Sequence, residues 1–401
     1  MKKEVNSMEK SVYLDYSATT PVKQEVFDAM LPYFMEEFGN PSSIYQIGIE
    51  NKNAITKARQ NVAALIGAEE QEIIFTSGGT ESDNWALCGT VRMLRKEGKN
   101  HVITTTIEHH AIHHTCDYLK EFEGCDITYL PVDEKGRVRP EDLKNAITDK
   151  TAIVSIMMAN NEIGTIQDIK TLSGICHEKG VLFHTDAVQA LGNVKIDVKE
   201  MGIDMLSMSA HKIYGPKGIG GFYIRKGIKL PNLIHGGAQE KGRRAGTENV
   251  AGIVGFGKAA ELALANIDKH IADISSKRDY FEKALLEKIP DIEVNGDTSN
   301  RLPGNCNILF HYIEGEALLL FMDIKKIFVS TGSACSSSSG AASHVLRACG
   351  IPEELALSTI RFTVGDLTTK EDLDYAINEI VMIAEKLRQI SPFNKDNKWE
   401  V

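Results

Sequence analysis

The stretch DMLSMSAHKIYGPKGIGGFYI, residues 204–224, decides the fold. Its alternating apolar run ends in small and polar residues, and Lys212 lies just past that end. Several glycines then allow the backbone to turn back into a second apolar run, which predicts two neighbouring strands. If Ser209 and His211 hold Lys212 in a partly desolvated position, its ammonium loses a proton more readily and can react with an aldehyde. The alternative is a surface lysine on a hairpin.

Short apolar runs alternate with helical patterns through the first part of the chain. We expect strands at EIIFTS, HVITTT, DITYLPV, TAIVSIMMA and VLFHTDA, with helices between them. This alternation predicts an α/β fold with a largely parallel sheet and helices on both faces. Before the first of these strands we expect one helix through DAMLPYFMEEF and another over residues 43–66. A long helical region over residues 250–288 precedes a smaller α+β domain.

The composition is that of an ordinary globular protein. The chain has 401 residues, of which 42% are hydrophobic and 25% charged, with a net charge of −10. This charge argues against a nucleic-acid-binding protein, which would present a basic face. Lys258 interrupts the most apolar run, so we expect no membrane span, and MKKEVNSMEK lacks the apolar segment of a signal peptide. The simplest expectation is a cytoplasmic protein.

The seven cysteines are scattered and include no C-x-x-C pair. Neither a disulfide framework nor a zinc site is therefore indicated. Six of them lie among apolar or helical neighbours and are expected in the core. Cys335 instead lies in STGSACSSSSGAAS, a stretch too small and polar for a core, so its thiol is expected to be exposed and used. The alternative is a flexible linker with an incidental cysteine.

The run FTSGGTESDNW places Gly78, Gly79 and Thr80 between a strand and a helix. Glycines let the backbone approach a ligand closely, and the free amides of a helix start favour an anion. The run lacks the pattern of a nucleotide P-loop, so it suits a single phosphate better than a triphosphate. An ordinary turn with a threonine cap explains the same residues.

Asp186 ends the apolar run VLFHTDAVQ, and Gln189 follows shortly after. An acid at this position can pair with a protonated ring nitrogen, although it would also serve as a helix N-cap. A lysine that reacts with an aldehyde, an acid for a pyridinium and a phosphate-binding turn are together what pyridoxal phosphate requires. Their occurrence at successive strand ends favours a site for this cofactor.

Other polar residues follow strand ends as well. His109 could stack on a flat cofactor ring and move protons. Its spacing to His113 would also suit two ligands of a metal ion, but the acid of an H-E-x-x-H site is missing between them. Asn160 and Asn161 could bridge cofactor and substrate or structure their loop. Arg361, inside a strand pattern, suits either a substrate carboxylate or an internal ion pair.

Taken together, these residues resemble the cysteine desulfurase family, within the fold-type I, class-V aminotransferase-like pyridoxal phosphate enzymes. The matching stretches run in order over almost the whole chain, and the most specific are AHKIYGPKG, RRAGTEN and GSAC. The resemblance implies a large domain with a mainly parallel seven-stranded sheet over residues 21–265. It also implies a small α+β domain, made of residues 1–20 and 266–401, that carries the cysteine loop.

The resemblance further implies roles for single residues. Lys212 would bind pyridoxal 5'-phosphate covalently, Asp186 would pair with the ring nitrogen, Gln189 would bond the ring hydroxyl, and His109 would stack on the ring. The phosphate would be bound by Gly79, Thr80, Ser209 and His211, together with Thr247 from the neighbouring subunit of a homodimer. The substrate carboxylate would be bound by Asn161 and Arg361.

The implied reaction converts L-cysteine to L-alanine and leaves a persulfide on Cys335. The long small-residue stretch around Cys335 resembles members that pass sulfur to an acceptor protein for iron–sulfur cluster assembly or tRNA thiolation. The C-terminal ISPFNKDNKWEV differs from the tail by which known members bind a scaffold protein. A selenocysteine lyase or a class-V aminotransferase is the alternative enzyme, and a non-catalytic sulfur-assembly scaffold is the alternative from another class.

Overall fold

The computed structural model describes residues 10–331 and 342–392 and divides into two compact units. We call Thr19–Asn161 with Thr165–Lys269 the large unit. The small unit comprises the residues up to Ala18, the short segment Glu162–Gly164, and the chain from His270 onward. The functional domains expected from the sequence, 21–265 and 1–20 with 266–401, stay a prediction.

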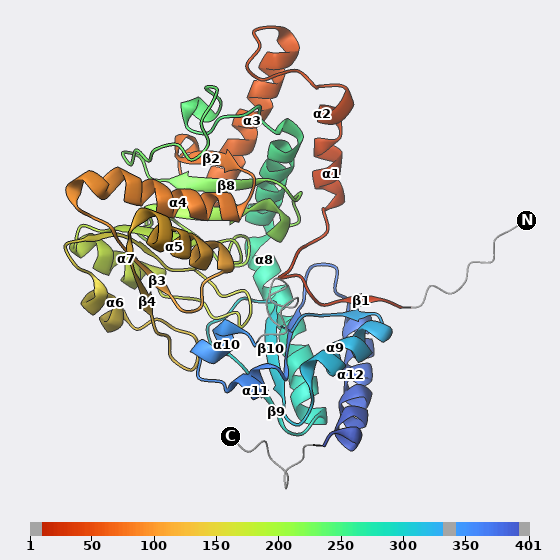
Figure 1. The fold of residues 1–401 in the computed structure, drawn as a ribbon. Helices are drawn as coiled ribbons and strands as arrows, with labels where there is room; N and C mark the ends of the chain where they lie inside the picture. Colours follow the sequence, from red (N-terminus) through yellow and green to blue (C-terminus); the bar gives the residue numbers. More distant parts are fainter. Residues whose placement is uncertain (1–9, 332–341, 393–401) are drawn as a thin grey trace, which may run out of the picture. The chain divides into compact units, whose positions relative to one another are not determined.

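A sheet that includes β2, β8, β3 and β4 forms the centre of the large unit (Figure 1). It has seven strands in the order β2-β8-β7-β6-β5-β3-β4. β8 is antiparallel to both of its neighbours, and the remaining strands are parallel to one another. The α/β fold with a mainly parallel sheet is therefore confirmed. The strands are β2 Ile73–Thr76, β3 His101–Thr105, β4 Asp126–Leu130, β5 Thr151–Ser155, β6 Leu182–Asp186, β7 Met205–Ser209 and β8 Gly220–Ile224.

Helices connect the strands and bury the faces of this sheet. Trp85 of α4 packs with Phe222 of β8, within an apolar cluster that also includes Ile112 and Leu119 of α5. Burial of such side chains is the main favourable contribution to the stability of this layer. The helices are α1 Gln24–Met30, α2 Pro32–Met35, α3 Gln46–Leu65, α4 Gly79–Leu94, α5 His110–Glu123, α6 Pro140–Ala146 and α7 Ile169–Glu178.

The prediction of a single helix through DAMLPYFMEEF is wrong. Its residues divide between α1, which ends at Met30, and α2, which begins at Pro32. Proline has no backbone N–H and is favoured in the first turn of a helix, so it starts a new helix here.

Helix α8, Val250–Lys288, contributes its residues up to Lys269 to the large unit and the rest to the small unit. Against the expectation from the sequence, it is long and apolar enough to cross a membrane by length and composition, with a window of mean hydropathy 1.4. Half of that window is buried inside the protein, and Phe256 and Ala260 are fully enclosed. We therefore describe α8 as a core helix.

The small unit contains a three-stranded antiparallel sheet in the order β12-β10-β9 and a parallel pair of β1 with β11. Phe281 of α8 and Phe310 of β10 both pack against Phe362 of β12 in its core. The strands are β1 Val12–Tyr13, β9 Ile292–Val294, β10 Asn305–Phe310, β11 Ile327–Phe328 and β12 Thr359–Thr363. The helices are α9 Gly315–Ile324, α10 His344–Ala348, α11 Glu353–Ala356 and α12 Lys370–Ile390.

Candidate active site

Six parallel strands of the large unit end at the same edge of the sheet, and candidate residues follow five of these ends. In open α/β sheets, ligands bind outside the carboxyl ends of the strands. Ten of the residues predicted from the sequence belong to the large unit, and most lie at this edge. They are Gly79 and Thr80 after β2, His109 after β3, Asn161 after β5, Asp186 and Gln189 at β6, Ser209, His211 and Lys212 at β7, and Thr247 before α8.

Asp186 and Lys212 come from the neighbouring strands β6 and β7. Asp186 is buried, and its Oδ1 accepts a 2.8 Å hydrogen bond from the backbone N–H of Val188. Burial raises the pKa of Asp186 to about 6, while this hydrogen bond and the charge of Lys212 act in the opposite direction. The lysine and the acid therefore interact electrostatically, and a cation near Asp186 would favour its ionised form.

The turn that carries Lys212 is held by a segment near the N-terminus. Oγ1 of Thr19 lies 3.2 Å from Nδ1 of His211, and the hydroxyl of Thr20 donates to the carbonyl oxygen of His211 at 2.9 Å. Thr20 also accepts a hydrogen bond from the backbone N–H of Tyr214, whose φ of 64° is in the left-handed region. Burial and the charges of Lys212 and Lys217 lower the pKa of His211 to about 4, so its ring is neutral at pH 7.

The first turn of α4 provides the features expected of a phosphate site. Gly79 starts the helix in a tight position, because a Cβ there would lie 2.5 Å from a methyl group of Val188. Gly220 of β8 faces Gly78 closely, since a Cβ on Gly220 would lie 2.6 Å from the Cα of Gly78. Thr80 is exposed in this turn. Backbone N–H groups at the start of a sixteen-residue helix favour an anion.

His109 is the N-cap of α5, and its Nδ1 accepts a 3.1 Å hydrogen bond from the backbone N–H of Ala111. The ring is half-buried, as are the side chains of Asn161 and Gln189. His113 is not placed for metal binding with His109, because its Nε2 lies 2.9 Å from the carbonyl oxygen of Thr105. Over residues 10–331 and 342–392, no group of three or more His, Cys, Asp or Glu side chains could hold a metal ion.

Asn160 and Asn161 have different surroundings. Asn160 is buried, and its side-chain amide donates to the carbonyl oxygen of Ile107 at 2.9 Å. Asn160 therefore structures the loop. Asn161 remains the candidate for contact with cofactor or substrate.

Arg361 belongs to the small unit, in the middle of β12. Its guanidinium Nη2 lies 2.8 Å from Oδ1 of Asp15, and Arg361 is 2% exposed. The internal ion pair that the sequence offered as one alternative is thus present. Contact with a substrate carboxylate stays a prediction, since a guanidinium has further N–H groups to donate.

Cys335 lies outside the described residues, and the structure describes the chain on both sides of it. Ser330 forms a backbone bridge with Arg361, and Ser343, the N-cap of α10, donates a hydrogen bond to the carboxylate of Glu162. All six cysteines in the described ranges are buried, as expected. Thr247 is exposed in the loop before α8.

The sequence reasoning assigned no role to Thr19, Thr20, Asp83 or Glu108. They lie in the stretches YLDYSATTP, FTSGGTESDN and EHHA, which fall within the almost full-length resemblance to the family. That resemblance is the signal that could have drawn attention to them. Their contacts join residues up to 192 positions apart, which the local sequence does not reveal.

Comparisons with known proteins agree with this arrangement. The profile of the Aminotransferase class-V family matches residues 12–376. The chain is 54% identical over 394 residues to Cysteine desulfurase IscS of Dictyoglomus turgidum, covering 98% of this chain and 99% of the relative. It is 55% identical to Cysteine desulfurase IscS of Methanosarcina thermophila, over 97% of this chain and 95% of the relative.

Two solved structures of NifS-like proteins are also similar to this chain over most of its length. A structure described as a NifS-like protein has a TM-score of 0.88 and 36% identity, over 94% of this chain and 100% of its own. The NifS-like protein of Rickettsia africae has a TM-score of 0.85 and 32% identity, over 94% of this chain and 100% of its own.

Proposed function

The chain belongs to the class-V aminotransferase family, and we propose that within it the protein is a cysteine desulfurase that depends on pyridoxal phosphate. The observation that carries this proposal is the placement of Asp186 and Lys212 at the carboxyl ends of adjacent strands. It occurs in a chain that is 54–55% identical, over nearly its whole length, to proteins named cysteine desulfurase.

The residues at this edge fit pyridoxal phosphate. The first turn of α4, with Gly79 and Thr80, would take the phosphate together with Ser209 and His211. A buried carboxylate at Asp186 suits a cationic ring nitrogen, and Lys212 would bind the aldehyde covalently. When bound, this cofactor supplies an electron sink for the charge that develops on the α-carbon of an amino acid.

The protein's own groups would then act as follows. Asp186 would keep a proton on the ring nitrogen, Gln189 would bond the ring hydroxyl, and His109 would stack on the ring. Lys212, as a free amine, takes the α proton of the substrate. Asn161 and Arg361 would bind the substrate carboxylate, Arg361 through the bidentate geometry of a guanidinium.

Cys335 would receive the sulfur. A thiolate is the nucleophile in such transfers, and an unperturbed cysteine with a pKa of about 8.5 is only a few per cent ionised at pH 7. In the net reaction the Cβ–S bond of L-cysteine breaks and an S–S bond forms on Cys335. L-Alanine is released, and the enzyme thiol becomes a persulfide, so sulfur, protons and electrons balance without a further reactant.

The proposal includes partners. A second copy of the chain would form a homodimer in which Thr247 of each subunit reaches the phosphate of the other, consistent with its exposure. An acceptor protein in the cytoplasm would take the persulfide sulfur for iron–sulfur cluster assembly or tRNA thiolation. We include neither a nucleic acid nor a membrane as a direct partner.

The test measures L-alanine and sulfide formed from L-cysteine in the presence of a thiol reductant. Cys335→Ala is expected to lose sulfide release, whereas Cys125→Ala, at a buried position in the large unit, is expected to keep it. Undiminished release by Cys335→Ala would reject this nucleophile. Turnover with a 2-oxo acid as amino acceptor would favour an aminotransferase, and a strong preference for selenocysteine would favour a selenocysteine lyase.

A further inference from the structure

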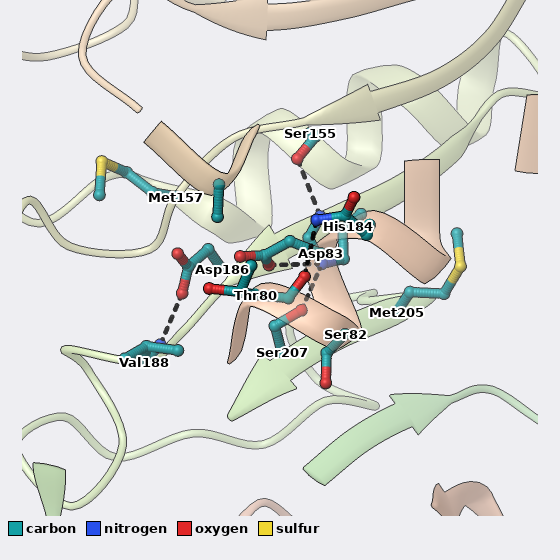
Figure 2. A network of polar contacts seen from close by, with 12 residues as sticks. Thr80, Ser82, Asp83, Ser155, Met157, His184, Asp186, Val188, Met205 and Ser207 are labelled. Atoms are coloured by element: carbon teal, nitrogen blue, oxygen red, sulfur yellow. Dashed lines mark hydrogen bonds and ion pairs between the residues drawn. The ribbon is translucent and has the colours of Figure 1, made fainter. Parts of the chain in front are cut away.

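A chain of buried polar groups lies within the large unit, formed by Asp83 of α4, Ser155 of β5, His184 of β6 and Ser207 of β7 (Figure 2). Nδ1 of His184 lies 2.8 Å from Oγ of Ser155, and Nε2 lies 3.0 Å from Oγ of Ser207. Oδ1 of Asp83 lies 3.7 Å from the same Nε2. All four residues are at most 1% exposed. A buried polar network of this kind is costly unless its groups satisfy one another.

Further charged groups surround this chain. Asp186 follows His184 by two residues on β6 and pairs in register with Ser207 of β7. Glu108, after β3, is fully buried and accepts hydrogen bonds from Thr105 and the backbone N–H of Met157. Lys212 is the cation whose charge acts on Asp186. Three buried carboxyl groups thus share one region with one lysine.

The three carboxyl groups cannot all be ionised at low cost, because like charges in a buried region repel strongly. Burial and repulsion from Asp186 raise the pKa of Asp83 well above its ordinary value, and Ser207 opposes this through a hydrogen bond. Burial raises the pKa of Glu108 to about 8. Asp186 has both a backbone N–H donor and a lysine whose charge acts on it. It is therefore the group best placed to carry the negative charge.

Ser207 shares a hydrogen bond with Nε2 of His184 and acts on Asp83 through another, while Oδ1 of Asp83 has no hydrogen-bond partner, so the proton positions depend on the state of Asp83. Burial lowers the pKa of His184 to about 3, so its ring is neutral and carries one proton. If Asp83 is a neutral acid, it donates to Ser207, Ser207 donates to Nε2, and Nδ1–H of His184 donates to Ser155. If Asp83 is ionised, it accepts from Ser207, and the ring must carry its proton on Nε2 instead. The tautomer of His184 thus reports the protonation state of Asp83.

We propose that Asp83 is a positioning residue that remains a neutral acid and, through Ser207 and His184, leaves Asp186 as the ionised member of these three buried carboxyl groups. The inference rests on the proposed role of Asp186 opposite the ring nitrogen of the cofactor. An ionised Asp83 would place a second negative charge behind Asp186 and would change the proton affinity of the ring nitrogen that Asp186 faces.

The first test determines the tautomer of His184 in the full-length protein without added cofactor, by ¹⁵N NMR of histidine-labelled chain. We expect the Nδ1–H form at every pH from 6 to 9. The resonance is assigned by its response to Ser207→Ala, which removes the neighbour of Nε2. An Nε2–H form, or a change from one tautomer to the other within this pH range, would overturn the proposal. The wild-type measurement stands even if a variant fails to fold.

The second test uses a matched pair of variants. Asp83→Ala removes the donor to Ser207 and is expected to leave a mixture of His184 tautomers. Asp83→Asn restores an N–H donor without a titratable group and is expected to restore the Nδ1–H form. A purely structural role for Asp83 would not predict this rescue of a single tautomer. Loss of the Nδ1–H form in Asp83→Asn would count against the proposal.

The third test follows the visible absorbance of added pyridoxal phosphate as a function of pH. The midpoint is expected to be the same in Asp83→Asn as in the wild type, because the substitution replaces one neutral group by another. A midpoint that moves to lower pH in Asp83→Asn would show that Asp83 carried a negative charge. If the cofactor does not bind at all, the proposed function fails, while the tautomer of His184 still decides the state of Asp83.

Discussion

Nη2 of Arg361 donates a hydrogen bond of 2.8 Å to Oδ1 of Asp15 within the small unit, where Arg361 is buried and Asp15 is half-buried. Asp15 lies two residues after the end of β1 and bridges Thr363 at the end of β12, so the pair joins the N-terminal segment to the strand that carries Arg361. A buried guanidinium without its carboxylate is strongly destabilising. Asp15 therefore both holds the N-terminal segment and fixes the direction of Arg361.

Asp15→Ala is expected to lower the free energy of unfolding by about 3 kcal/mol, the lower end of the range for removal of one partner from a buried ion pair. Asp15→Asn keeps an oxygen acceptor for Nη2, so its loss is expected to be smaller. Denaturant titration of each variant measures the change. Under the proposed function, Asp15→Ala also raises the KM for L-cysteine more than it lowers kcat, because Arg361 loses its orientation.

Glu200→Ala is the matched control, because Glu200 and Lys170 form a pair whose side chains are 70% and 65% exposed. Such a pair contributes roughly 0–1 kcal/mol. If Asp15→Ala and Glu200→Ala lowered the free energy of unfolding by equal amounts, the importance assigned to burial of Arg361 would be contradicted.

Removal of the lysine amine should change the acid on which its charge acts. The charge of Lys212 lowers the pKa of Asp186, against the larger effect of burial that raises it to about 6. In Lys212→Ala without cofactor, the pKa of Asp186 is therefore expected to rise above its wild-type value, as followed by ¹³C NMR of the aspartate carboxyl groups. The same variant is expected to retain no cofactor covalently after borohydride reduction.

Lys217→Ala serves as the control for this substitution, since Lys217 is exposed and acts on His211 rather than on Asp186. It should leave the pKa of Asp186 and the covalent retention of cofactor unchanged. Covalent cofactor in Lys212→Ala would show that another amine binds the aldehyde.

Glu108 should make the stability of the protein depend on pH. Its pKa rises from the ordinary 4.5 to about 8 on folding, because burial disfavours the charged form. Between these two pH values the folded chain holds a proton that the unfolded chain has released. The contribution of Glu108 to the stability of the folded chain is therefore fully present below pH 4.5 and is lost as the pH rises towards 8. The expected slope is about 1.4 kcal/mol per pH unit for one proton.

Glu108→Gln removes this slope, so the variant should lose less stability than the wild type between pH 5 and 8. Denaturant titrations of the protein without cofactor at several pH values test the difference. Glu97→Gln, at an exposed position on the same unit, should leave the slope as in the wild type. A variant Glu108→Gln whose stability still falls with the wild-type slope would show that Glu108 is ionised in the folded protein.

The candidate site could be predicted where a strand and its end lie next to each other in the sequence. β6 is a short apolar run that ends in Asp186, and β7 is another that leads directly to Lys212. Because the carboxyl ends of parallel strands meet at one edge, the two runs alone predict that the acid and the lysine are neighbours. The same argument places Gly79 after β2 and His109 after β3.

The supporting contacts could not be predicted, since they depend on how distant elements pack. Asp83 lies in a stretch with an ordinary helical pattern, and only the packing of α4 on the sheet brings it to His184. Thr19 reaches His211 across 192 positions of sequence. The position of Cys335 relative to these groups lies outside the described residues.

A side chain at Gly79 is expected to disturb the first turn of α4. The Cβ of Gly79→Ala would lie 2.5 Å from a methyl group of Val188, closer than unstrained contacts allow, so the helix start or Val188 must move. Val188 also donates the backbone N–H that bonds Asp186, so the displacement reaches both the phosphate turn and the acid. We expect the affinity for pyridoxal phosphate to fall at least about tenfold, which corresponds to about 1.4 kcal/mol.

Gly174→Ala in α7 is the control, because nothing lies within 4 Å of its Cβ. It should leave affinity unchanged and stabilise the helix by up to about 1 kcal/mol. Equal cofactor affinity in the two variants, measured by equilibrium absorbance titration, would mean that Val188 adapts without moving the turn.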